Sequence, residues 1–504
     1  MTLVVSRNPA TGASRDLDVH DTSSSEVRAL SKRASSIAAE FARRPLAWRA
    51  SLLRAMADEL ERRAPSLVEV AMEETALPRP RLEGELRRTA FQFRFFSDVV
   101  LDGAFLQASI DHATDSAMGP LPDLRRVRVP IGPVAVFGSS NFPFAFSVPG
   151  GDSASALAAG CPIVIKAHPA HPATSLATFE ALVSAANAAG APEGLLGLVF
   201  GLEAGVALVQ DPAISAIGFT GSVAAGRALW QLANARATPI PFFGELGSAN
   251  PLVVTQSAAN ERASEIGAGI AGSMTLGVGQ FCTKPGLLFV PAGNPGDEVV
   301  TSLAGVLRDL SGMTMLSEGI AAHFGEGTNA IAAVQGVSHL VGGALDGATQ
   351  VVAQLFEVDT DVFNGPFAAA LHEECFGPLA IVVRYRNVSD LRVALEGVQP
   401  ALTFSVFSED NDPDAPWLIE LAQEKSGRVI ANQFPTGVGV SWSMQHGGPW
   451  PSTTNSAATS VGAGSIDRWL RPVTYQALRA ELLPTALRDD NPLGVPQRVD
   501  GVQS

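Results

Sequence analysis

Short apolar segments alternate with helical segments through the middle of the chain, between residues 127 and 235. The first of them, VRVPIGPVAVFG (127–138), is rich in β-branched residues and is bounded by glycine, which is typical of a strand. Strands that are buried on both faces of a parallel sheet are continuously apolar, and crossover helices separate them along the chain. We therefore predict an α/β fold with a doubly wound parallel sheet. Its expected strands are 127–138, 161–168, 194–201 and 214–221, and its expected helices are 152–160, 174–190, 203–210 and 222–235.

Two further regions flank this alternation. Residues 24–100 are predicted to be helical, because 50–75 and 85–100 repeat apolar residues at spacings of three and four with charges between them. A second α/β region is predicted from about residue 250 to about residue 449. Its expected strands include 250–255, 286–292 and 378–385. A chain of 504 residues is too long for one compact core, so we expect two large domains.

The composition argues against several classes of protein. The net charge of −15 repels phosphate backbones, so nucleic acid is not an expected partner, although local dipoles can still hold a nucleotide cofactor. Hydrophobic residues make up 46% and charged residues 17%, which is typical of a globular protein. We find no signal peptide and no membrane-spanning segment in the sequence. Three cysteines do not make a disulfide framework, so a cytoplasmic protein is expected.

The segment FTGSVAAG (219–226) joins a predicted strand to a predicted helix. Gly221 allows a tight turn there, and Ser222 is a favourable N-cap residue. The free N–H groups at the start of this helix can hold a pyrophosphate. The segment is equally compatible with an ordinary turn between a strand and a helix, since the G-x-G-x-x-G pattern is absent.

Two side chains outside that turn have chemistry of interest. Cys282 lies in GQFCTKPG (279–286), between glycine-bounded segments, whereas Cys161 and Cys375 fit the role of buried apolar residues better. Local context leaves Cys282 open as either a nucleophile or a core residue. Glu245 follows an apolar strand and precedes a glycine turn, so it is either a solvated loop charge or a general base whose pKa is raised by burial.

Other catalytic patterns are not evident in the sequence. His168 and His171 share the segment KAHPAHP (166–172), but no third ligand lies nearby, so we expect no metal site. The sequence has no Gly-x-Ser-x-Gly elbow and no phosphate-binding Walker loop.

Taken together, several segments resemble the aldehyde dehydrogenase superfamily, in the family's order and at its spacing over nearly the whole chain. They are NFP (141–143), IVIKAHP (163–169), GFTGS (218–222), ELGSANP (245–251), GQFCTKPG (279–286) and EECFGP (373–378). Three longer segments are similar to the branch that acts on α-ketoglutarate semialdehyde (2,5-dioxopentanoate). These are residues 141–172, 444–455 and 470–494.

The resemblance implies catalytic roles for three residues. Cys282 would be the nucleophile, whose thiolate attacks the aldehyde carbon. The resulting oxyanion would be held by the side-chain amide of Asn141 and the backbone N–H of Cys282. After hydride transfer a thioester remains, and Glu245 would activate the water that hydrolyses it. No histidine partner is required for this chemistry.

The resemblance also implies how NAD(P) would bind. Lys166 matches the contact to the adenosine ribose, Ser222 the contact to the pyrophosphate, and Glu374 the contact to the nicotinamide ribose. Phe376 would pack near the nicotinamide ring. The remaining expected cofactor residues are Phe219, Gly221 and His168.

The fold that the resemblance implies has three parts, namely a Rossmann-like cofactor domain, an α/β catalytic domain and a small oligomerisation arm. Residues 1–106 and 129–246 would form the cofactor domain, and 247–449 the catalytic domain. Residues 107–128 and 450–504 would form the arm and the C-terminal tail. Members of the family form homodimers and homotetramers, and either is expected here.

The choice of cofactor depends on the position that follows Lys166 by three residues. Members of the family that prefer NAD usually carry glutamate there, where it repels a 2′-phosphate, but this chain has Pro169. The predicted helix at 203–210 offers no arginine to complete a phosphate site. We expect both cofactors to work, with NADP moderately preferred.

The expected substrate, α-ketoglutarate semialdehyde, carries a carboxylate and calls for a fixed cation in the pocket. In the family, the helix that corresponds to 85–100 lines the substrate tunnel, and Arg88 would point inward from it. Arg88 is alternatively a solvated helix charge like its neighbour Arg87. The other expected lining residues are Phe142, Phe146 and His446.

Three alternatives to this function are considered. The aromatic residues of the pocket would also suit a medium-chain or aromatic aldehyde. A CoA-acylating semialdehyde dehydrogenase usually lacks the hydrolytic glutamate, and Glu245 is present here. A non-enzymatic binding module would be free to lose its nucleophile or its oxyanion donor, and this chain retains Asn141, Glu245 and Cys282.

Overall fold

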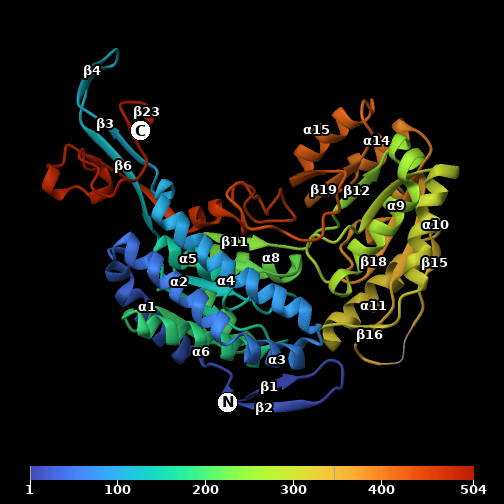
Figure 1. Cartoon of the computed structure of the whole chain (residues 1–504), viewed down its shortest axis with the longest axis horizontal. Coiled ribbons are helices and arrows are strands. Elements are labelled where there is room, and N and C mark those ends of the chain that lie inside the picture. The colour runs from blue at the N-terminus through green and yellow to red at the C-terminus, as the bar shows by residue number, and fades with distance from the viewer. Residues whose placement is uncertain (1, 345–346, 504) are drawn as a thin grey trace.

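The computed structural model describes residues 2–344 and 347–503, and two large, mainly parallel sheets form its two main bodies (Figure 1). The first sheet is five-stranded and parallel, with the order β11-β10-β7-β8-β9. Its strands are β7 (Val134–Phe137), β8 (Ile163–Lys166), β9 (Leu196–Val199), β10 (Ala216–Thr220) and β11 (Phe242–Glu245). The predicted α/β fold with a doubly wound sheet is therefore confirmed.

The helices that connect these strands end and begin at favourable capping residues. Gly160 ends the first of them in a left-handed conformation (φ 97°), and Ser222 begins the last, its Oγ accepting the N–H of Ala225 at 3.3 Å. The helices are α5 (Gly151–Ala159), α6 (Pro172–Ala188), α7 (Leu202–Gln210) and α8 (Val223–Asn234).

The prediction of one strand over 127–138 is wrong. This segment contains two strands, β6 (Leu124–Pro130) and β7, which belong to different sheets. The chain bends between them at Gly132, whose φ of 115° is a conformation that a residue with a Cβ rarely adopts. Its apolar neighbours conceal this bend in the sequence pattern.

Four helices precede the first sheet and confirm the helical prediction for residues 24–100. The last of them, α4, packs against α2 and α5 and buries Phe93 and Phe96. Its buried Glu85 accepts hydrogen bonds from the backbone N–H groups of Phe144 (2.9 Å) and Ala145 (2.8 Å), and so fixes the loop that follows β7. The four helices are α1 (Ser24–Ala42), α2 (Leu46–Arg62), α3 (Ala64–Thr75) and α4 (Arg79–Asp102).

The second sheet is seven-stranded, with the order β15-β17-β18-β13-β12-β19-β20, and β15 runs antiparallel at its edge. Its strands are β12 (Pro251–Val254), β13 (Leu287–Pro291), β15 (Ser338–Val341), β17 (Gln354–Asp359), β18 (Leu379–Tyr385), β19 (Ala401–Phe407) and β20 (Ser426–Ala431). The strands predicted at 250–255, 286–292 and 378–385 correspond to β12, β13 and β18.

Helices cover both faces of the second sheet. Alternate residues of β18 point to opposite faces, as the strand period requires. Ala380 and Val382 pack with α9 and α10, whereas Ile381 and Val383 pack with α11, α14 and α15. The helices of this body are α9 (Gln256–Thr275), α10 (Asn294–Arg308), α11 (Glu318–Ala332), α12 (Thr360–Phe363), α13 (Ala369–His372), α14 (Val388–Glu396) and α15 (Ala415–Lys425).

A third sheet, with the order β21-β6-β3-β22-β23, projects from the first body beside the C-terminus (Figure 1). Its further strands are β3 (Ala108–Asp111), β21 (Leu470–Gln476), β22 (Gln497–Val499) and β23 (Val502–Gln503). Smaller two-stranded sheets pair β1 (Leu3–Arg7) with β2 (Ser14–His20), β4 (Thr114–Ser116) with β5 (Gly119–Leu121), and β14 (Met313–Thr314) with β16 (Gln350–Val351). In the described part of the chain, no helix is both long enough and apolar enough to cross a membrane.

Part of the tail that we predicted to belong to the arm lies elsewhere. Residues 450–469 run beside the first sheet, where Thr453 forms a bridge with Glu245 and Arg468 forms an ion pair of 2.7 Å with Asp152 of α5. Residues 450–469 therefore belong with the first body, close to Glu245, and only the part of the tail from β21 (Leu470–Gln476) onward joins the third sheet.

Candidate active site

Loops at the carboxyl ends of the first sheet and the amino ends of the second sheet supply the candidate site. In the first sheet, the order of the strands along the chain reverses between β7 and β10, which in open parallel sheets is where ligands bind. Asn141 follows β7, Ser222 follows β10, and Glu245 ends β11. From the second sheet, the loops that precede β13 and β18 carry Cys282 and Glu374.

The loop that carries Cys282 begins with a left-handed turn after α9, in which Gly277, Val278 and Gly279 all have positive φ. A Cβ at Gly279 would clash with the backbone of Gly377 and Pro378, so the loop lies directly against the loop that carries Glu374. Because Gly279 combines positive φ with this close approach, other residues do not fit there.

Asn250 holds the other end of the nucleophile loop. It is fully buried, and its Nδ2 lies 2.7 Å from the carbonyl oxygen of Cys282 and 3.0 Å from that of Lys284. Its Oδ1 accepts the backbone N–H of Thr403 on β19 (3.2 Å). Asn250 thereby connects the backbone on both sides of Thr283 to the second sheet.

Asn141 lies beside the nucleophile loop from the opposite side. Its Nδ2 donates to the carbonyl oxygen of Gln280 at 2.9 Å, which fixes the orientation of the amide. An amide nitrogen carries two hydrogens, so a second donor remains for an oxyanion. The loop that carries Asn141 is held in turn by Glu85, whose carboxylate accepts hydrogen bonds from the backbone N–H groups of Phe144 and Ala145.

His446 lies between the predicted nucleophile and the predicted base. Its Nε2 is 3.4 Å from Sγ of Cys282 and 3.9 Å from Oε2 of Glu245. The sequence analysis assigned His446 to the substrate pocket and required no histidine beside Cys282. In the structure the imidazole contacts the thiol directly, while its distance to Phe146 (6.4 Å between ring centres) agrees with a place at the pocket wall.

Burial favours the uncharged form of each of these three groups. It raises the pKa of the Cys282 thiol to about 12, with Glu245 and Glu374 adding to the rise and Arg428 opposing it. It also raises the pKa of Glu245 well above its usual value, although Arg468 opposes this. Burial lowers the pKa of His446 to about 3, with Arg428 contributing. The resting site therefore has a neutral imidazole and a protonated thiol.

A small cavity of about 10 Å³ adjoins Glu245. Such a volume can hold one water molecule if polar groups surround it. Oε2 of Glu245 has no hydrogen-bond partner among the described residues. The cavity is lined by Phe243, Gly244, Glu245, Thr453, Asn455, Ala458, Thr459 and Arg468.

The predicted cofactor residues fit the adenosine end of a dinucleotide. Lys166 ends β8, and burial lowers its pKa to about 8, with Asp21 opposing the shift. Nδ1 of His168 accepts the N–H of Ala170 at 3.1 Å, so the proton of this neutral ring is on Nε2, where it can be donated to a ligand. Gly205 of α7 leaves space beside Lys166, since a Cβ there would lie 3.6 Å from Cγ of the lysine.

The start of α8 fits the pyrophosphate, although two predicted residues have other roles. Within the described chain, the N–H groups of Val223 and Ala224 at the helix start donate no hydrogen bond, so they are available to a ligand. The N–H of Gly221 instead donates to the carbonyl oxygen of Glu245 at 3.0 Å. Phe219 is buried in the core of the first sheet, so its position supports the turn and does not offer a contact surface.

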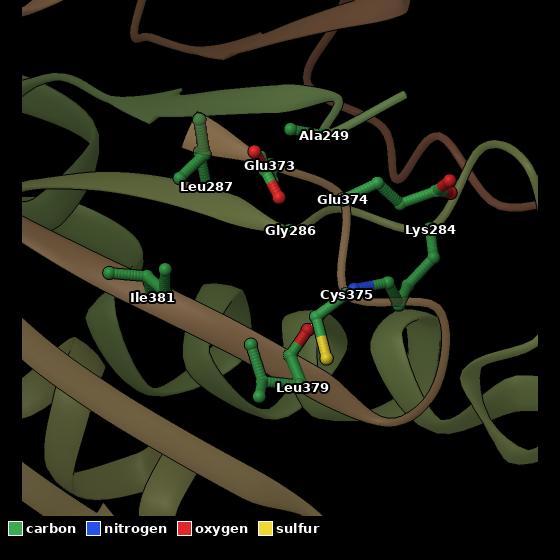
Figure 2. A pocket seen from close by; sticks show the side chains of 9 residues that line it. All are labelled: Ala249, Lys284, Gly286, Leu287, Glu373, Glu374, Cys375, Leu379 and Ile381. Atoms are coloured by element: carbon green, nitrogen blue, oxygen red, sulfur yellow. The ribbon is translucent and has the colours of Figure 1, made fainter. Parts of the chain in front are cut away.

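Glu374 lies near Lys284 at the border of a second cavity of about 10 Å³. Figure 2 shows that the amino group of Lys284 lies beside Cys375, whereas the carboxylate of Glu374 points away from it. The Lys284 Nζ donates to the carbonyl oxygen of Leu379 at 2.6 Å. Burial raises the pKa of Glu374 to about 7, and Lys284 opposes this rise. Phe376, predicted to lie near the nicotinamide, is half-buried in the same loop.

Aromatic side chains and arginines line the side of the site toward α4. The rings of Phe142 and Phe146 are 5.1 Å apart, and Phe142 lies 4.9 Å from Phe281 of the nucleophile loop. The guanidinium of Arg88 lies 5.1 Å from the centre of the Phe146 ring. Arg88 is half-buried, unlike the exposed Arg87, so it is not a solvated helix charge.

Two residues of this site were missed in the sequence. Asn250 lies inside the segment ELGSANP, but its role depends on carbonyl groups more than thirty positions away in the chain. Arg428 lies on the edge strand β20, where an alternating arginine is ordinarily a surface residue. No local pattern distinguishes it, and only the fold brings it near Cys282.

Comparison with known proteins agrees with this geometry. The aldehyde dehydrogenase family matches residues 2–471 of the chain. The chain is 45% identical to alpha-ketoglutaric semialdehyde dehydrogenase 2 of Azospirillum brasilense over an alignment of 463 residues. This alignment covers 91% of this chain and 88% of the relative. It is 42% identical to alpha-ketoglutaric semialdehyde dehydrogenase of Acinetobacter baylyi, with coverage of 90% and 87%.

Solved structures show the same fold. The NADP-dependent glyceraldehyde-3-phosphate dehydrogenase of Bacillus halodurans, complexed with NADP, superposes with a TM-score of 0.79 at 23% identity, over 94% of this chain and 96% of the other. Aldehyde dehydrogenase 21 of Physcomitrella patens, in complex with succinate, gives a TM-score of 0.79 at 22% identity, over 95% of each chain. With a cysteine, an asparagine amide and a buried glutamate assembled between two α/β bodies, and with a family match over almost its whole length, this chain belongs to the aldehyde dehydrogenase family and is an NAD(P)-dependent oxidoreductase.

Proposed function

We propose that this enzyme oxidises α-ketoglutarate semialdehyde to α-ketoglutarate with Cys282 as nucleophile. The observation that carries the assignment of the nucleophile is the position of Cys282 beside His446, with the amide of Asn141 fixed on the same loop. The two relatives above 40% identity carry the name of that semialdehyde, which supports the substrate. Arg88, a half-buried cation on the pocket wall, suits its carboxylate.

The first half of the mechanism forms a thiohemiacetal. Glu245, in its ionised form, takes the proton of the Cys282 thiol through a bridging water, and its raised pKa makes this carboxylate a stronger base than an exposed one. His446 hydrogen-bonds to the sulfur and orients it, since its lowered pKa prevents it from keeping the proton. The thiolate then attacks the aldehyde carbon, and the new oxyanion receives hydrogen bonds from the Asn141 amide and the Cys282 backbone N–H.

The second half of the mechanism hydrolyses a thioester. Bound NAD(P)⁺ supplies the hydride acceptor for the oxidation. Lys166, the start of α8 and Glu374 are the residues that would hold and orient the dinucleotide. After releasing the thiol proton to solvent, Glu245 removes a proton from a water molecule, whose oxygen attacks the thioester carbon, and the Cys282 thiolate leaves with the electron pair of the C–S bond. The presence of Glu245 favours water over CoA as the acceptor of the acyl group.

The same proposal covers cofactor preference. Lys166 and the Nε2–H of His168 offer two donors near the position of an adenosine 2′-phosphate, and Pro169 brings no repelling carboxylate. Asp21 lies near Lys166, and α7 offers no arginine, which limits the advantage of the extra phosphate. We propose that both cofactors are used, with NADP moderately preferred.

The proposed setting is a cytoplasmic homodimer or homotetramer that associates through the third sheet. Three free cysteines suit a reducing compartment. The β4–β5 hairpin at the end of the projecting sheet exposes Met118 and Leu121, with 94% and 44% of their surface accessible, which suits contact with another subunit.

A panel of aldehydes with each cofactor, reporting kcat/KM from absorbance at the reduced nicotinamide band, tests the proposal. We expect α-ketoglutarate semialdehyde to be preferred over hexanal and benzaldehyde. A wild-type enzyme that prefers hexanal would reject the substrate, and a kcat/KM with NAD more than about tenfold above that with NADP, roughly 1.4 kcal/mol, would reject the cofactor preference.

A further inference from the structure

One loop of the catalytic body holds two arginines from opposite sides of the site. Arg428 on β20 donates through Nη1 to the carbonyl oxygen of Gly437 at 2.8 Å and through Nη2 to that of Pro435. Arg88 on α4 donates through Nε and Nη2 to the carbonyl oxygen of Val438, at 3.4 and 3.3 Å. Residues 435–438 therefore bring together two guanidinium groups from distant parts of the chain.

Neither guanidinium has a counterion in the part of the chain that the structure describes. Among the described residues, the ion pairs include none for Arg88 or for Arg428. Glu85 acts electrostatically on Arg88, but its carboxylate is bound to Arg81 at 2.5 Å and to two backbone N–H groups. Nη1 of Arg88 and Nε of Arg428 are buried without a hydrogen-bond partner. A desolvated, unpaired cation is costly, so this pair calls for an anion.

Both arginines act on the reacting groups. Arg428 opposes the rise in the pKa of the Cys282 thiol, and both Arg428 and Arg88 help to lower the pKa of His446. The N–H of Gly437 donates to Oγ1 of Thr283 at 3.4 Å, so the loop that holds both guanidinium groups contacts the residue next to Cys282. The guanidinium groups therefore border the site of a short substrate whose aldehyde carbon is at Cys282.

We propose that Arg88 and Arg428 together bind the α-keto carboxylate end of the substrate, with Arg428 as the residue that distinguishes an α-keto acid from a simple carboxylate. The inference rests on the proposed function, since it assigns the polar end of the semialdehyde. An α-keto carboxylate presents two carboxylate oxygens and a neighbouring carbonyl oxygen as acceptors. One planar guanidinium suffices for a carboxylate alone, whereas a second one can also bind the keto oxygen.

This division of roles predicts a graded response to substitution. Arg428→Met should lower kcat/KM for α-ketoglutarate semialdehyde by about ten- to a hundredfold, because a charge-assisted hydrogen bond is lost. The loss should be smaller for 5-oxopentanoate, which has the carboxylate without the keto group. For hexanal, which has no carboxylate, the loss should be the smallest of the three, and it measures the effect of Arg428 on the Cys282 thiol alone. Arg428→Lys should recover part of the loss, since lysine restores the charge without the planar fork.

Two controls keep the outcome clear. Arg87→Met removes an exposed arginine on the same helix as Arg88, and it should leave kcat/KM unchanged for all three substrates. Equal losses on all three substrates in Arg428→Met would show that Arg428 only supports Cys282 or the 435–438 loop, and would overturn the inference. Unchanged kcat/KM for the semialdehyde would also overturn it.

A binding measurement separates this inference from the proposed function. α-Ketoglutarate should protect Cys282 of the wild-type enzyme from alkylation by iodoacetamide better than glutarate does, and Arg428→Met should remove that difference. If the wild type fails to oxidise the semialdehyde yet shows this protection, the proposed substrate is wrong and the α-keto carboxylate site stands. Equal protection by both acids would reject the site.

Discussion

Replacing Glu245 by glutamine tests the proposed base with almost no change of shape. Glu245 is 8% exposed, and one of its carboxylate oxygens has no partner among the described residues, so the amide enters the same space. Glutamine cannot accept a proton, and removal of a general base costs about 10²–10⁴-fold in rate. We expect the steady-state kcat of Glu245→Gln to fall within that range.

Pre-steady-state kinetics of Glu245→Gln identify the catalytic step in which Glu245 acts as the base. If Glu245 activates only the hydrolytic water, the variant forms the thioester and stalls, which gives a burst of about one reduced cofactor per active site in stopped-flow absorbance. If Glu245 also deprotonates the Cys282 thiol, as the thiol pKa of about 12 suggests, the burst itself slows. A variant with wild-type turnover would show that another group is the base.

The pH dependence gives a second measurement on the same residue. The pKa of Glu245 is raised, and only the carboxylate accepts a proton, so wild-type kcat should fall as the pH drops through that raised pKa. In Glu245→Gln this acidic limb should disappear. An acidic limb that persists unchanged in the variant would assign it to a different group.

Two further substitutions test the nucleophile and its support. Cys282→Ala should abolish oxidation while cofactor binding, measured by fluorescence titration, is retained; turnover in this variant, with Cys161→Ala inactive instead, would contradict the assignment. Asn250→Ala removes the donor to the carbonyl groups of Cys282 and Lys284, and leaving such groups unsatisfied costs about 1–3 kcal/mol each. We expect a lower melting temperature and a lower kcat, and a variant with wild-type values of both would refute the positioning role.

The sequence was sufficient to predict those strands and site residues that a local sequence pattern or a family motif marks. The strands β8, β9 and β10 of the first sheet and β12, β13 and β18 of the second are short apolar segments bounded by turn residues, so their places were predictable from the sequence pattern. The strands β15, β17, β19 and β20 of the second sheet were not predicted. Cys282, Glu245 and Asn141 lie in segments that resemble a family. Asn141 and Glu245 lie at the carboxyl ends of strands of the first sheet, and Cys282 precedes β13 of the second sheet. The bend at Gly132 was missed because the apolar pattern extends across it without interruption. Only the positive φ of that glycine separates the two strands.

Other parts of the site depend on contacts that no local pattern records. His446 lies in an irregular segment between β20 and β21, and only folding places its ring 3.4 Å from the sulfur of Cys282. Arg428 alternates along an edge strand as a surface residue would, and its burial results from the loop at 435–438 that folds over it. Such residues are specified by tertiary structure, so their chemistry becomes visible only with the fold.

The arrangement of charge explains how a buried thiol with so high a pKa can still react. Burial penalises the creation of a new charge, but a proton transfer from Cys282 to an ionised Glu245 moves a negative charge without adding one. Arg428 lowers the pKa of the thiol, so the charge moves toward a cation. A substrate carboxylate that pairs with the arginines would reduce this attraction. The thiolate is therefore favoured by the proton transfer to Glu245, and the oxyanion formed after its attack is stabilised by the donor at Asn141. These are the interactions that substitutions should disturb first.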